Sequence, residues 1–149
     1  MAPAKTTPVV DALAVLLSNS YTLYLKTQNF HWNVTGPMFT TLHALFMTQY
    51  SELALAVDEI AERMRALGAY APGSFAEFKS RSAVKEATGH PDAKAMIKAL
   101  VADQAAVVAA AERLFAAAEK ARDQASADLA TRRLDVHQKN AWMLRVHLE

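Results

Sequence analysis

The chain has 149 residues, of which 52% are hydrophobic, and its 16 basic and 15 acidic side chains give a net charge of +1. This length suits one domain with a buried core, and the balanced charge excludes both a strongly basic nucleic-acid-binding chain and an acidic disordered one. The sequence contains no cysteine, which excludes disulfides and thiolate metal sites and favours a cytoplasmic location. We expect no signal peptide and no membrane association, because the apolar runs are short.

Long apolar helices, separated by a few glycines and prolines, are the predicted elements. The first helix is expected over 8–34, with Thr7 as its N-cap and a proline at its first position. The second is expected over 38–67, with Gly68 as its C-cap.

The second half of the chain predicts three more helices. Ser74 and Glu77 form a capping-box pattern, which indicates a short helix in the connection after the second helix. A third long helix is expected over 91–121, and a fourth from just after Ser126 to the end of the chain.

These elements predict an all-α, ferritin-like four-helix bundle with a short extra helix in its long connection. That connection, of about 22 residues, lets the second and third long helices run parallel, as they do in ferritin-like bundles. We expect a single domain over 8–149, preceded by a short tail over 1–7.

Four side chains could bind a metal: His31, His43, Asp58 and Glu62. Nitrogen and carboxylate oxygen without sulfur suit iron, manganese or zinc. Taken singly, each has a simpler explanation. A lone helical histidine is more often a surface or hydrogen-bonded residue, and the two acids could pair with Arg63 and Arg65 on a solvated helix face. In combination the four favour a metal site.

The spacing along the second helix divides these ligands into two groups. Asp58 lies fifteen residues beyond His43, which is roughly 22 Å along an α-helix. One iron cannot bind both, because metal–ligand bonds are near 2 Å. We therefore expect two half-sites in one subunit. If the second helix packs antiparallel to its copy across a two-fold axis, each histidine pair meets the carboxylates of the other subunit.

The bundle interior is expected to be apolar and free of metal. Ordinary di-iron bundles use Glu-x-x-His motifs within one bundle. No glutamate of this chain has a histidine three residues later.

The chain closely resembles the Dps family, the mini-ferritins named DNA-binding proteins from starved cells, in the segments HWNVTGPMFTTLH, DEIAERMRALG and HQKNAWMLRVHLE. The resemblance covers essentially the whole chain. It implies a homo-oligomeric shell of twelve subunits with ferroxidase activity. Ferrous iron would be oxidised at the two-fold interface, preferably by hydrogen peroxide, and stored inside as ferric mineral, which protects DNA from hydroxyl radicals.

By this resemblance, Asp58 and Glu62 of one subunit bind the first iron with His31 of the other, while His43 assists a second, weaker position. Zinc or manganese could occupy the same site. Trp32 resembles the family tryptophan beside the site and could give up an electron to a stray oxidant, although plain interface packing explains it equally well.

Three further positions follow from the resemblance. Family members commonly carry an acid where this chain has Met47, and a thioether is a poor ligand for ferrous iron, so the second position should be weaker or filled through water. Asp123 and Asp128 match acids that line a three-fold pore admitting ferrous ions. Alternatively, the charge of Asp128 simply favours a helix N-terminus.

DNA binding is expected to be weak or absent at physiological salt. Family members usually bind DNA through basic tails, whereas this tail offers only Lys5 and the terminal amine. The alternative function is a nucleoid-associated protein that compacts DNA directly, and a purely structural helical oligomer is a third hypothesis. The remaining histidines, His90, His137 and His147, are expected at the surface or an interface.

Overall fold

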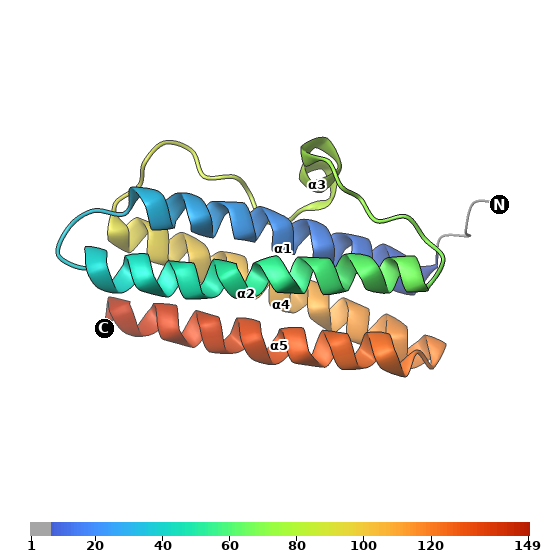
Figure 1. The fold of residues 1–149 in the computed structure, drawn as a ribbon. Coiled ribbons are helices and arrows are strands. Elements are labelled where there is room, and N and C mark those ends of the chain that lie inside the picture. The colour runs from blue at the N-terminus through green and yellow to red at the C-terminus, as the bar shows by residue number, and fades with distance from the viewer. Residues whose placement is uncertain (1–6) are drawn as a thin grey trace.

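Four long helices and one short helix account for most of the structure, a computed structural model that describes residues 7–149. The predicted tail, with Lys5, therefore lies outside the described residues except for Thr7. The elements are α1 (Pro8–Asn33), α2 (Phe39–Ala66), α3 (Phe75–Arg81), α4 (Ala93–Ala121), α5 (Gln124–Arg145) and a closing 3-10 turn η1 (Val146–Leu148). Figure 1 shows a bundle of α1, α2, α4 and α5, in which α2 and α4 run in the same direction. The predicted fold class is confirmed.

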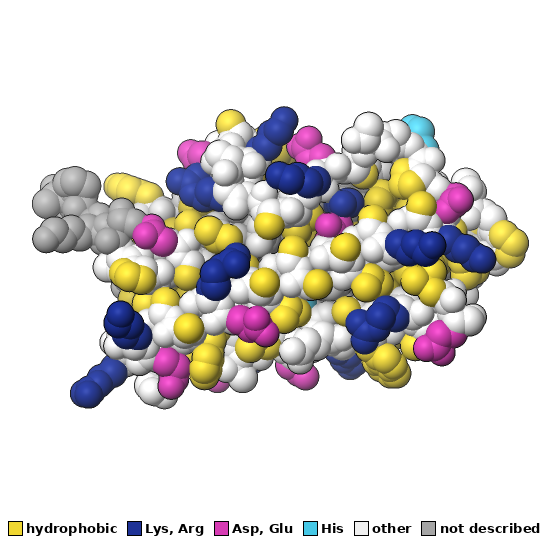
Figure 2. All heavy atoms as spheres, turned by 180° about the vertical axis from the view of Figure 1, so that it is seen from behind, with side chains coloured by type: hydrophobic (Ala, Val, Ile, Leu, Met, Phe, Trp, Pro, Cys, Tyr) yellow, Lys and Arg dark blue, Asp and Glu magenta, His cyan; other side chains and the backbone are white. Residues whose placement is uncertain are grey.

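Charged side chains of both signs cover the outside of this bundle. Figure 2 shows the face opposite to that of Figure 1, where Lys and Arg alternate with Asp and Glu and with small apolar patches. No continuous basic surface is visible on this face of the described residues.

Two of the helices begin where the sequence predicts. At α1, the Thr7 hydroxyl accepts a hydrogen bond from the Val10 amide at 3.2 Å. At α3, the Ser74 hydroxyl accepts from the Glu77 amide at 3.3 Å, and the Glu77 carboxylate accepts from the Gly73 amide at 2.8 Å. The capping box is therefore present, although its returning bond goes one residue further back than in the standard pattern.

The starts predicted for the last two long helices are wrong, because aspartates cap both. The Asp92 side chain accepts from the Ala95 amide at 2.8 Å, so α4 begins after Asp92 rather than at Pro91. The Asp123 carboxylate accepts from both the amide and the hydroxyl of Ser126, at 3.0 and 2.6 Å. Ser126 thus lies inside the first turn of α5 and is not its cap. Two acceptor oxygens allow one carboxylate to make both bonds.

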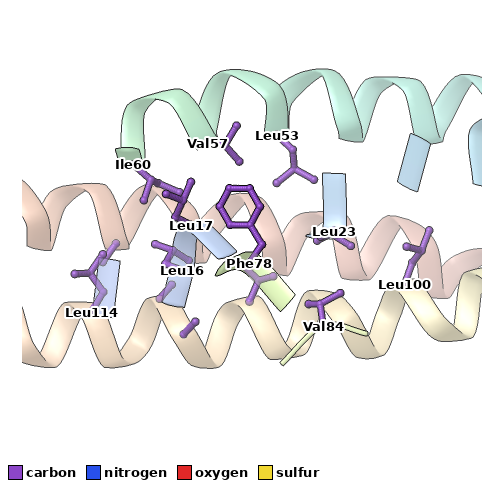
Figure 3. Close-up of a cluster of buried hydrophobic side chains, with 14 of the residues drawn as sticks. Leu16, Leu17, Leu23, Leu53, Val57, Ile60, Phe78, Val84, Leu100 and Leu114 are labelled. Atoms are coloured by element: carbon purple, nitrogen blue, oxygen red, sulfur yellow. The ribbon is translucent and has the colours of Figure 1, made fainter. Parts of the chain in front are cut away.

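The apolar core runs along the centre of the bundle and includes the long connection. Tyr21 of α1 stacks on Phe78 of α3 with ring centroids 4.7 Å apart, which fastens α3 to the bundle. By length and apolar composition α1 could cross a membrane, but half of its most apolar stretch is buried, as in the core helix of a bundle. Figure 3 shows ten labelled residues of this buried cluster: Leu16, Leu17, Leu23, Leu53, Val57, Ile60, Phe78, Val84, Leu100 and Leu114.

The interior is not wholly apolar, contrary to the expectation from the sequence. The Lys26 ammonium of α1 lies 2.8 Å from a carboxylate oxygen of Asp103 in α4, and both residues are buried. Burial raises the pKa of the Asp103 carboxyl, and the neighbouring Lys26 charge opposes that rise. A charged pair therefore crosses the core between α1 and α4.

His137 was expected at the surface or an interface, but it is completely buried. Its Nδ1 lies 2.7 Å from the Gln104 side-chain oxygen, and its Nε2 lies 2.9 Å from the Arg133 guanidinium. Burial, together with the Arg133 charge, lowers the pKa of His137 to about 3, so the ring is neutral. Arg133 also donates two hydrogen bonds to Glu52, at 2.6 and 2.8 Å. This chain of contacts joins α4, α5 and α2, and it runs from the buried His137 to the partly exposed Glu52.

Candidate metal site

The last turn of α1 and the second turn of α2 bring two histidine side chains together. The imidazole rings of His31 and His43 are stacked, with centroids 3.8 Å apart and planes 14° from parallel. His31 is nearly buried and His43 is half-buried. The sequence expectation that the short connection would place both imidazoles at one end of the bundle is therefore met.

Each imidazole is held by the backbone of the other residue. The Nδ1 of His31 lies 2.7 Å from the carbonyl oxygen of His43, and the Nδ1 of His43 lies 2.7 Å from the carbonyl oxygen of His31. A carbonyl oxygen only accepts, so each Nδ1 must carry a hydrogen. In the neutral ring this leaves the lone pair on Nε2, and a backbone carbonyl behind a ligand histidine is a common arrangement in metal sites.

Two aromatic rings enclose the histidine pair, and the sequence interpretation missed both. The Tyr50 ring meets His31 edge-on at 5.2 Å, and the Phe39 ring stacks on His43 at 5.0 Å. The available signal was positional, because Phe39 is one helical turn before His43 and Tyr50 is two turns after it. These contacts fix the ring planes, so both Nε2 atoms are held in place before any ion binds.

Asp58 and Glu62, the two carboxylates predicted to form the second half-site, are both exposed on α2. The simpler explanation, that they pair with nearby arginines, does not hold. Arg63 donates to Asp123 at 2.8 Å, and Arg65 donates to the carbonyl of Ala69 at 3.0 Å. Across residues 7–149, no salt bridge reaches either carboxylate.

The two half-sites do not meet within one subunit. No three histidine, aspartate or glutamate side chains of the described range gather in a group that could hold an ion. Elsewhere in the subunit, His90 is exposed and His147 is half-buried, as expected from the sequence. The predicted nitrogen ligands thus lie at one place in the chain and the predicted oxygen ligands at another, roughly 22 Å away along α2.

Comparison with known proteins identifies the family. Residues 10–149 match the family model of the ferritin-like domain. The chain is 35% identical over 147 residues to the DNA protection during starvation protein of Brevibacillus brevis, covering 96% of this chain and 99% of that one. Its fold matches Dps from Staphylococcus aureus with a TM-score of 0.92 at 34% identity, covering 95% of each chain.

The chain belongs to the Dps family. The Dps protein of Vibrio cholerae, described as a member of a broad superfamily of ferritin-like diiron-carboxylate proteins, matches with a TM-score of 0.90 at 30% identity over 95% of this chain and 89% of that one. The resemblance stated from the sequence motifs is therefore confirmed.

Trp32 of this Dps subunit lines a cavity whose walls do not include the histidine pair. Trp32 is 60% exposed, and the cavity, of about 530 Å³, lies between α1, α3 and the long connection. Leu25, Phe75 and Phe78 line the same cavity. Both proposed roles of Trp32, electron donation and packing against another subunit, remain open predictions.

The two expected pore aspartates of the Dps subunit have different surroundings. Asp123 caps α5 and forms an ion pair with Arg63 at 2.8 Å. Partial burial raises the pKa of its carboxyl, but bonds from Ser126 and Arg63 outweigh burial and lower it overall. Asp128 is exposed, and one of its oxygens lies 3.0 Å from Arg132. Of the two carboxylates, Asp128 is therefore the better placed to attract a passing cation.

We expect Asp128→Asn to slow ferrous uptake severalfold at low ionic strength, with a smaller effect at high salt, because the attraction is electrostatic. Stopped-flow absorbance of iron oxidation at two salt concentrations measures this. Asp135→Asn, the same charge change at another exposed site on α5, serves as the control. Equal rates for Asp128→Asn and Asp135→Asn would leave Asp128 without a role in a pore.

Proposed function

We propose that the chain is the subunit of a cytoplasmic, twelve-subunit shell that oxidises ferrous iron at sites shared between subunits and stores the ferric product. The observation that carries this proposal is the stacked His31–His43 pair, whose Nδ1 atoms are hydrogen-bonded to backbone carbonyls and whose Nε2 atoms have no hydrogen-bond partner among residues 7–149. Relatives named for DNA protection during starvation support the biological role.

In the proposed interface, α2 packs antiparallel to α2 of a second copy. Placing His43 opposite the partner's Asp58 puts the two-fold axis near residues 50–51, the midpoint between them. The exposed residues of α2 around that point include Ser51 and Ala54, which are small enough for two helices to approach closely. The two-fold axis brings the histidine pair of each subunit to the carboxylate pair of the other. Two subunits therefore form two equivalent sites.

The imidazole and carboxylate ligands of the proposed site have different roles. The Nε2 atoms and the partner's carboxylates hold ferrous ions, and the carboxylate charge favours the ferric product because hard oxygen donors suit the higher oxidation state. Two ferrous ions together give the two electrons that hydrogen peroxide needs: 2 Fe²⁺ + H₂O₂ yields 2 Fe³⁺ + 2 OH⁻. Delivering both electrons at one site avoids the one-electron cleavage that releases hydroxyl radical.

Oxidation of ferrous iron by peroxide, followed by absorbance, tests the activity directly. His31→Ala should slow it by roughly 100-fold, because losing even a supporting partner of a metal ligand costs 10–100-fold. His147→Ala removes a half-buried histidine outside the site and should retain the parental rate. Zinc should inhibit by occupying the ligands without changing oxidation state. Parental rates in an assembled His31→Ala shell would contradict the proposed activity.

We expect DNA to be protected by chemistry rather than by tight binding. Within residues 7–149, basic and acidic side chains are interspersed on the face in Figure 2, and few phosphate contacts give weak, salt-sensitive binding. Plasmid should show little or no gel shift near physiological salt. It should nevertheless survive iron plus peroxide in the presence of the parent protein.

Asp58→Ala is the control for that experiment, because it keeps the tail and the surface but removes a ligand. The variant should lose most of the DNA protection. If it protected plasmid as well as the parent does, physical shielding would be the mechanism, and the alternative of a nucleoid-associated protein that compacts DNA would be favoured.

A further inference from the structure

We propose that Met47 is a reacting group of the same site. Peroxide consumed at the site oxidises its thioether to a sulfoxide, and the new sulfoxide oxygen then serves as a ligand for the second iron position. This inference rests on the proposed function, because the peroxide and the iron are those of the shared site.

The exposure of Met47 separates it from the other methionines of residues 7–149. Its side chain is 51% exposed, whereas Met64 and Met96 are 2% and 1% exposed. Met38 and Met143 are half-buried. About half of this large apolar residue is left uncovered by its own subunit, so that part of it meets solvent or a second copy.

The position of Met47 along α2 places it beside the histidine pair. It follows His43 by four residues, so the two side chains lie on one helical face a turn apart, roughly 6 Å between their Cβ atoms. With the two-fold axis near residues 50–51, the turn that carries Met47 faces residues 54–58 of the partner. Met47 therefore lies one helical turn from its own His43, beside the place where His43 faces the partner's Asp58.

The oxidation needs no group beyond those already named. The thioether sulfur attacks one oxygen of hydrogen peroxide, the O–O bond breaks, and an S–O bond forms. Sulfur is oxidised by two electrons and peroxide is reduced by two; the departing oxygen keeps one hydrogen, gains a second as a proton, and leaves as water. The balance is R–S–CH₃ + H₂O₂ giving R–S(O)–CH₃ + H₂O, and the product is reversible by methionine sulfoxide reductases.

The product changes what the side chain offers to iron. A thioether is a soft donor, which ferrous and ferric iron bind poorly, whereas a sulfoxide presents a hard, polar oxygen. Met47 is already held one turn from His43, so no backbone movement is needed to present that oxygen. The first turnovers would therefore complete the weaker iron position, and a reductase would return it to its initial state.

Peptide mapping by mass spectrometry tests the first step on the assembled protein. The shell is loaded anaerobically with ferrous iron, treated with stoichiometric peroxide, and digested. Met47 sulfoxide should exceed that of Met143, which has no metal site beside it, by about tenfold, because proximity to the reacting peroxide raises the effective concentration. Peroxide without iron, and the Asp58→Ala shell with iron, should each leave Met47 only with the oxidation that its greater exposure allows, well below the level reached by the parent with iron.

Anaerobic titration with ferrous iron tests the second step on shells from which the iron has been removed. Oxidised parent should bind the second metal about tenfold more tightly than untreated parent, and methionine sulfoxide reductase should reverse the gain. Met47→Leu, which keeps the volume and removes the sulfur, should show no gain after the same treatment. Unchanged second-site affinity in oxidised parent would overturn the ligand role.

The iron-oxidation rate, recorded in the same reaction, separates this inference from the proposed function. If iron is not oxidised, the proposed function fails. If iron is oxidised while Met47 is no more oxidised than Met143, or is oxidised equally without iron, the inference about Met47 is wrong and the side chain serves only to pack against the second copy.

Discussion

Shells assembled from equal amounts of His31→Ala and Asp58→Ala subunits should recover about a quarter of the parental rate of rapid iron oxidation. Each variant alone should nearly lose it. Random pairing makes half of the two-fold contacts mixed, and a mixed contact has two sites, of which one unites an intact His31 with an intact Asp58. One half of one half is a quarter. Stopped-flow absorbance on co-assembled shells, with shell size checked by gel filtration, measures the recovery.

The matched control for this experiment combines both changes in one chain. Shells that mix the double variant with His31→Ala have no intact pairing of His31 with Asp58 and should stay inactive. Suppose that fully assembled shells of His31→Ala and Asp58→Ala subunits were as inactive as this control. Each subunit would then have to complete its site with its own side chains. That result would exclude the shared arrangement.

Breaking the buried ion pair should have the largest effect on stability. Asp103→Ala leaves the Lys26 ammonium inside the bundle without its partner at 2.8 Å. An unpaired buried charge typically costs about 3–5 kcal/mol. We therefore expect a large fall in the urea midpoint, followed by far-UV circular dichroism at one fixed protein concentration, because assembly also contributes to stability.

Removing both charges together should have the opposite outcome. The double variant Lys26→Met with Asp103→Leu should be at least as stable as the parent, since apolar pairs of similar volume often replace buried ion pairs without loss. Glu112→Ala, at an exposed position of α4, should stay within about 0.5 kcal/mol of the parent. A double variant as unstable as Asp103→Ala would show that the pair stabilises the bundle in itself.

The pairing of the two histidines could be predicted because its signals are local. His31 and His43 flank one short connection, so helix ends alone bring them together, and the 3.8 Å stacking of their rings agrees with that expectation. The four-residue spacing of Asp58 and Glu62 likewise fixes their common helix face. Spacing within one chain could not determine how a second copy packs against it. The assignment of all four side chains to one shared site therefore stays a prediction.

The polar interior was missed because its partners are far apart in sequence. Gln104 and His137 are separated by thirty-three residues, and their hydrogen bond exists only once α4 and α5 are packed. On α5, which carries many charged and polar side chains, a single histidine looks like a surface residue. The cap of α5 was mistaken for a related reason: Asp123 and Ser126 are both good N-caps, and the choice depends on Arg63 of α2, which holds Asp123 from another helix.

The separation of His43 from Asp58 along α2 has a consequence for when the chemistry begins. In the proposed arrangement a newly made, solitary subunit has only half of each ligand set, so it can hold iron only poorly and cannot oxidise it. Activity per chain then rises with the concentration of chains and vanishes on dilution, as mass action requires. Iron would be oxidised only once two copies have met, which is also when the shell that retains the product starts to form.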